Sequence, residues 1–173
     1  MEGEIYLFNL SLMALTFATV SALVMLFRQT MGGKLSNFDI YLASTFIGVS
    51  FADAVAAILP PLVMLFEPEN VVLWVVSSGL SALMIGAITA ASLRRRIMVA
   101  GGTLPFLQAL AFIAGGVGVI LLALNVVVLP WQGVALHALG VTLSLAGAMW
   151  AFVRRIASLL GASPGEDWDP KRG

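Results

Sequence analysis

Apolar residues fill most of the chain in five long runs, which short polar connections separate. The runs span Ile5–Phe27, Ile40–Leu65, Val71–Leu93, Pro105–Val128 and Trp131–Val153. A transmembrane helix needs about 20 consecutive, predominantly apolar residues, and each run reaches that length. The pattern therefore predicts an all-α, polytopic membrane protein, built as a bundle of five transmembrane helices.

The composition agrees with this prediction and leaves little room for anything else. Hydrophobic residues make up 60% of the 173 residues and charged residues only 10%, whereas a soluble domain has about 25% charged residues. The runs occupy nearly all of residues 1–160, so we predict one membrane domain with no soluble catalytic part, and no enzymatic activity. Residues 161–173 are polar and rich in turn formers, which predicts a disordered cytoplasmic tail.

The charges predict the orientation of the bundle. All nine basic residues fall in alternate connections: Arg28, Lys34, Arg94, Arg95, Arg96, Arg154, Arg155, Lys171 and Arg172. The connections on the other side carry only acidic charges: Glu2, Glu4, Glu67 and Glu69. Basic connections stay in the cytoplasm. We therefore expect a multi-pass protein of the cell inner membrane, with its N-terminus outside and its C-terminus cytoplasmic.

One acidic residue, Asp53, lies in the middle of the second apolar run. A carboxylate at the bilayer midplane is costly, and it normally faces a bundle interior or a water-filled cavity. Helical spacing places Ser50, Ala56 and Ala57 on the same side of the helix as Asp53. That face is small and partly polar, so we expect it to pack against other helices.

Two prolines, Pro60 and Pro61, follow Asp53 by about two turns. Proline has no backbone N–H, so the carbonyls of Ala56 and Ala57 lose their usual intrahelical donors. Free carbonyls near a carboxylate would form an oxygen-rich spot for a proton, a hydronium ion or a small cation. The alternative is a structural kink, in which a neutral Asp53 bonds a hydroxyl or a freed carbonyl.

The fifth run contains a stripe of small residues that includes the only histidine of the chain. Its members recur at gaps of four and three residues: Gly133, His137, Gly140, Ser144, Gly147 and Ala151. Small residues let membrane helices approach closely, so the stripe predicts a tight contact within the chain or between copies. Counting along the helices puts His137 and Asp53 about 10 Å apart in depth, too far for a direct bond. With one histidine and no cysteine, we expect His137 to be a hydrogen-bonding residue, with no metal and no haem.

A short string in the third run, Gly79-Leu80-Ser81-Ala82, resembles the G-x-S-x motif of rhomboid-type intramembrane serine proteases. The resemblance implies Ser81 as nucleophile, with His137 as its base. It covers only four residues, and a motif needs its structural context, so we do not predict a hydrolase.

Two functions of different classes fit the sequence. The first is a non-enzymatic packing or assembly role, as a homo-oligomer or an accessory subunit of a larger membrane complex. The small-residue stripes and short connections favour it. The alternative is a small channel or transporter for ions or protons that uses Asp53. Because no other run repeats the acid and its prolines, an inverted repeat is not visible, and we expect the first. Beyond the lipid bilayer and such membrane partners, we expect no cofactor and no nucleic acid.

Overall fold

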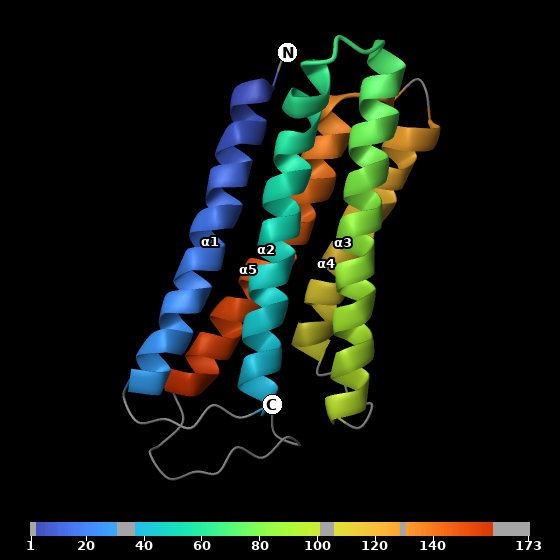
Figure 1. The fold of residues 1–173 in the computed structure, drawn as a ribbon. Coiled ribbons are helices and arrows are strands. Elements are labelled where there is room, and N and C mark those ends of the chain that lie inside the picture. The colour runs from blue at the N-terminus through green and yellow to red at the C-terminus, as the bar shows by residue number, and fades with distance from the viewer. Residues whose placement is uncertain (1–2, 31–36, 101–105, 129–130, 161–173) are drawn as a thin grey trace.

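The computed structural model describes residues 3–30, 37–100, 106–128 and 131–160, and this part of the chain forms five long helices (Figure 1). They are α1 (Glu4–Thr30), α2 (Asn37–Met64), α3 (Asn70–Ala100), α4 (Phe106–Val127) and α5 (Val134–Leu160). All five are long and apolar enough to cross a membrane. The predicted all-helical fold with five spanning helices is confirmed to that extent. The predicted tail, residues 161–173, lies outside the described residues.

Two helices continue further than the apolar runs predicted. The third run was expected to end at Leu93, but α3 continues to Ala100, and α5 continues beyond Val153 to Leu160. Arginine is a good helix former, so the charged residues that end the apolar runs do not end the helices. The length of the apolar run therefore underestimates the length of the helix at the C-terminal ends of α3 and α5.

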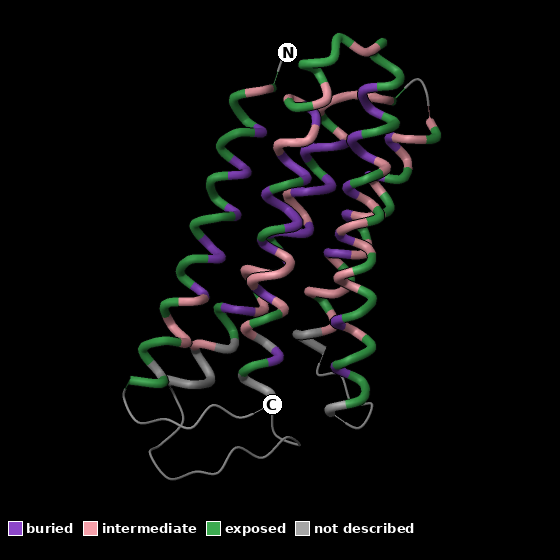
Figure 2. Tube along the Cα trace, in the orientation of Figure 1, coloured by how far each residue is buried: buried purple, intermediate pink, exposed green. Residues whose placement is uncertain are grey.

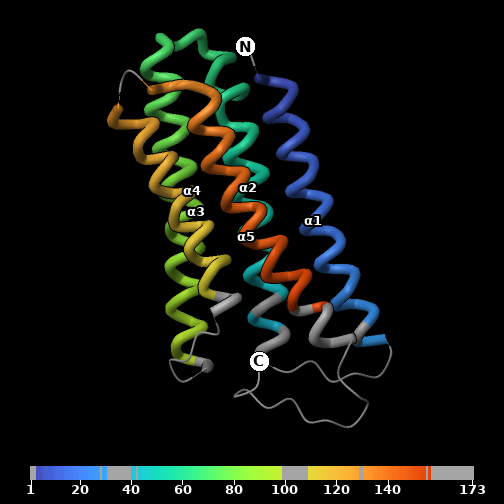
Figure 3. Tube along the Cα trace, turned by 180° about the vertical axis from the view of Figure 1, so that it is seen from behind, coloured from blue at the N-terminus to red at the C-terminus, as the bar shows by residue number. Residues whose placement is uncertain are grey.

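The helices run alternately up and down, and each packs on its neighbour in the sequence (Figure 1). In addition α5 returns to α2, so α2, α3, α4 and α5 enclose a common interior while α1 lies mainly on α2. The view from behind shows α5 crossing between α1 and α4 (Figure 3). The central positions of α2 and α5 bring Asp53 and His137 into the interior.

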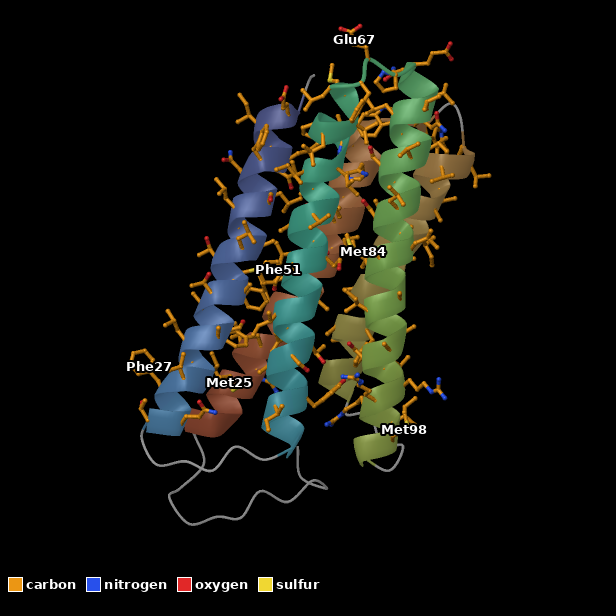
Figure 4. The ribbon with its side chains drawn as sticks, in the orientation of Figure 1. Met25, Phe27, Phe51, Glu67, Met84 and Met98 are labelled. Carbon is orange, nitrogen blue, oxygen red and sulfur yellow. The ribbon has the colours of Figure 1, made fainter. Side chains whose placement is uncertain are left out.

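The two ends of the bundle differ in charge. Glu67 lies at one end, and Phe27 and Met98 lie at the other (Figure 4). We call the first the acidic end, because Glu4, Glu67 and Glu69 lie there, and the second the basic end, which holds Arg94, Arg95, Arg96 and Arg154. The acidic end also contains the turn between α4 and α5.

Burial is concentrated on the faces that the helices turn toward one another (Figure 2). Near the basic half, Phe17, Phe46 and Phe152 meet edge to face, with ring centroids 5.1–6.4 Å apart, a preferred geometry for aromatic pairs. The outward faces carry large apolar side chains, such as Leu83, which is 73% exposed. An apolar exterior of this kind suits a lipid environment.

The closest helix contact is between α4 and α5, where glycines face each other. A Cβ atom added to Gly118 would lie 2.5 Å from the carbonyl oxygen of Gly140, and one added to Gly147 would lie 2.8 Å from that of Ala111. These distances are too short for any side chain, so the two backbones touch. The stripe on α5 thus packs within the chain at Gly140 and Gly147, whereas no atom lies within 4 Å of a Cβ added to Gly133.

Gly118→Ala should destabilise the bundle, because the new methyl group meets the backbone of α5 rather than a movable side chain. Overpacking of this kind costs about 1–3 kcal/mol. The matched control is Gly116→Ala on the same helix, where a Cβ has nothing within 4 Å. The control should be neutral or stabilising, since alanine exceeds glycine by about 0.5–1 kcal/mol in a helix. Thermal unfolding in detergent measures both; equal stabilities would contradict a backbone contact at Gly118.

Candidate functional site

Asp53 lies on the inner face of α2 and is completely buried. Neither of its carboxyl oxygens has a hydrogen-bond partner. The hydroxyl of Ser144 on α5 interacts with the carboxyl, but no hydrogen bond of acceptable geometry joins them. A buried polar group without a partner is rare in folded proteins and calls for an explanation.

The predicted bond from Asp53 to a hydroxyl or a freed carbonyl is not formed with acceptable geometry, and two of its expected partners are engaged elsewhere. The Ser50 hydroxyl donates to the carbonyl oxygen of Phe46, 2.7 Å away, within its own helix. The carbonyl of Ala56 is bonded by His137. The side chains next to Asp53 along the chain, those of Ala52 and Ala54, are buried and apolar.

His137 bridges α2 and α3 from its position on α5. Its Nε2 lies 2.9 Å from the carbonyl oxygen of Ala56, and its Nδ1 lies 2.9 Å from the Ser78 hydroxyl. A carbonyl oxygen only accepts, so Nε2 carries the hydrogen. In a neutral imidazole Nδ1 is then an acceptor, and Ser78 donates to it. For the neutral ring the contacts therefore select a single tautomer.

Asn125 extends these contacts to α4. Its Nδ2 donates to the Ser78 hydroxyl at 2.8 Å and to the carbonyl of Gly133 at 3.2 Å, while its Oδ1 accepts from the Gly133 N–H at 2.8 Å. The Asn125 side chain thus hydrogen-bonds both to Gly133, just before α5, and to Ser78 on α3. We call Asn125, Ser78, His137 and the Ala56 carbonyl the His137 network.

Proline explains why the network ends at Ala56. In a regular helix the N–H of residue 60 would donate to the carbonyl of residue 56, but Pro60 has none. His137 supplies the missing donor from α5. Both Ala56 and His137 are fully buried, where an unpaired carbonyl would be costly. The bond therefore compensates for Pro60 within α2, which continues to Met64.

The structure separates the predicted site residues into two groups. Ala56 and His137 belong to the His137 network, which replaces the donor that Pro60 lacks and contacts Gly133 through Asn125. Asp53 and Ser144 form the second group, with Ser50 one turn toward the basic end. Ala57 is buried on α2, and Ala151 is half-buried near the aromatic core.

Sequence reasoning missed Asn125 and Ser78 as partners of His137. An isolated amide in the apolar run from residue 117 to 128 was the available signal, because polar side chains in membrane helices commonly hydrogen-bond across helices. Trp74 is also buried there, with its ring centroid 6.0 Å from that of His137.

The Ser78–His137 pair also has the spacing of a nucleophile and its base. Ser78 is completely buried and already accepts a hydrogen bond from Asn125, so the pair has the surroundings of a structural contact. Ser81, the serine of the rhomboid-like string, donates instead to the carbonyl of Ser77. Among the described residues, no three His, Cys, Asp or Glu side chains gather where they could hold a metal ion.

Comparisons with known families, curated proteins and solved structures find no match. The assignment of a function therefore depends on the geometry of the described residues.

Replacing His137 should destabilise the protein less when Pro60 is absent. His137→Phe keeps a ring but removes the donor to Ala56, which we expect to cost about 1–2 kcal/mol. Pro60→Ala restores a backbone N–H that can reach the same carbonyl, so the histidine becomes partly dispensable. Chemical or thermal unfolding of the two single variants and the double variant gives the coupling energy.

Pro61→Ala is the matched control for this cycle, since it restores a donor to Ala57 and not to Ala56. The cost of His137→Phe should stay unchanged in that background. Equal costs in all three backgrounds would show that the Ala56 bond does not stabilise α2.

Proposed function

We propose that this chain is an integral membrane protein whose acidic end lies outside and whose basic end lies in the cytoplasm of an inner membrane. Support comes from five helices of spanning length and from the charge difference between the ends. Basic residues are retained on the cytoplasmic side during insertion.

Reporter fusions test the orientation. Fusions after Lys34, near Gly101 and at the C-terminus should be active in a cytoplasmic assay, and a fusion near Glu69 should be active only in an external one. A C-terminus that scores as external would contradict the proposed orientation.

Within that membrane we propose that the protein binds and passes a small cation, with Asp53 as the binding group. The single observation that carries this proposal is a completely buried carboxyl with no hydrogen bond to either oxygen. An ionisable side chain inside a membrane bundle is expensive and typically marks an ion or proton pathway. A purely structural carboxyl would gain stability from bonding a neighbour, which Asp53 does not do.

The packing or assembly role remains the second candidate. Small-residue stripes were part of its support, and on α5 Gly140 and Gly147 meet α4 of the same chain. On α3, Gly86 lies against Val119 of α4. These small residues are accounted for by contacts inside one chain, so they give no separate support to an oligomer. The buried carboxyl of Asp53 is not explained by a contact of this kind.

Asp53→Asn should abolish cation flux while leaving the fold intact. The amide has the shape of the carboxyl but cannot ionise, and it can still interact with the Ser144 hydroxyl. Purified protein in vesicles, placed under a proton gradient and separately under a sodium gradient, provides the measurement.

Asp53→Glu, which keeps the acid, should retain part of the flux, and Ser81→Ala should be unaffected because Ser81 bonds only within α3. Absence of flux in the wild-type vesicles under both gradients would refute the transport proposal and leave the packing role.

A further inference from the structure

We infer that the species bound at Asp53 is an exchangeable proton and not a metal cation. This inference rests on the proposed function, because it names the ion which that site handles. The polar atoms and the charges near the carboxyl of Asp53 support it.

The surroundings of Asp53 offer few oxygen ligands. The hydroxyls that we place beside it belong to Ser144 on α5 and to Ser50, one turn away on α2, and the hydrogen of Ser50 is already donated to Phe46. The carbonyl of Ala57, which Pro61 leaves without its helix donor, adds one backbone oxygen one turn away. Hard divalent cations take about six to eight oxygens, and alkali cations also need several oxygens to replace their water shell. A proton needs one carboxyl oxygen.

Among the residues that the structure describes, the basic side chains of the helices lie near the helix ends and away from Asp53. On α1 the charged groups, Glu4 and Arg28, lie at the helix ends, and on α3 the arginines begin at Arg94 near the basic end. Helix α4 has no charged residue. On α5 the arginines begin at Arg154, and both ring nitrogens of His137 are engaged by Ser78 and the carbonyl of Ala56. Protonation removes the buried charge without any further ligand, which a metal ion cannot do here.

The His137 network is not the route of this proton. Each hydrogen bond in it points the same way, from Asn125 to Ser78, then to His137, and finally to the carbonyl of Ala56. A backbone carbonyl has no hydrogen to pass on, so the chain ends there. The network holds α2 in place, and proton exchange at Asp53 is expected to survive its disruption.

The transfer itself is simple. A hydronium ion gives one proton to a carboxylate oxygen of Asp53 and leaves one water molecule. The reverse step returns the proton to water and restores the carboxylate. No electron transfer and no co-reactant is involved.

Infrared spectroscopy of the reconstituted protein tests the inference directly. The wild type should show a carboxylic C=O stretch that Asp53→Asn lacks, and this band should shift on transfer into D₂O. Added sodium, potassium or lithium chloride should leave the band unchanged. His137→Gln, which keeps a donor in the network, should lower thermal stability but leave the band and its shift intact.

The outcomes separate this inference from the proposed function. Loss of the band on addition of one of the three salts would overturn the inference of a bound proton in favour of a metal cation. Absence of a carboxylic band specific to the wild type would overturn it in favour of an ionised site. Neither result excludes flux, so the proposed function would survive both. A band that never shifts in D₂O, together with absent flux, would overturn both proposals. If His137→Gln abolishes the shift of the band in D₂O, the conclusion that proton exchange at Asp53 does not use the His137 network would be wrong.

Discussion

The hydrogen bond from His137 to the carbonyl of Ala56 is the contact on which the interior depends. Pro60 removes the donor that a helix would normally supply, and α5 replaces it with an imidazole N–H at 2.9 Å. That bond fixes the tautomer, the tautomer makes Ser78 a donor, and Ser78 in turn accepts from Asn125. Four helices are thus joined through one chain of satisfied polar groups, which is how buried polar networks remain stable in low dielectric.

Asp53 stands out because its neighbours are satisfied without it. One turn toward the acidic end, every polar atom of the His137 side chain has a partner. Toward the basic end, Ser50 bonds its own helix and Phe46 belongs to the aromatic cluster. The carboxyl therefore lies between a completed network and an apolar layer. This placement, rather than its charge alone, makes a ligand-binding role more plausible than a structural one.

The sequence was sufficient for the helices and insufficient for the contacts between them. Apolar length predicts five helices because spanning length is a local property of the chain. The loss of a donor to Ala56 also follows locally from Pro60. Which side chain replaces that donor depends on how α5 crosses α2, and residue spacing does not contain that angle. Asn125 was missed for the same reason: its partners, Ser78 and Gly133, lie 47 and 8 residues away.

The glycine contact between α4 and α5 has a mechanical consequence. Side chains between two helices let the helices shift relative to each other, since they can change rotamer while the backbones stay in place. At the contact of Gly118 with Gly140 no side chain separates the two backbones, so we expect α4 and α5 to tilt and rotate as one body. Helix α2 is joined to this body by side-chain packing and by the imidazole of His137, which can turn about its side-chain bonds. We therefore expect any rearrangement that opens the surroundings of Asp53 to take place at α2, while the paired helices α4 and α5 keep their relative positions.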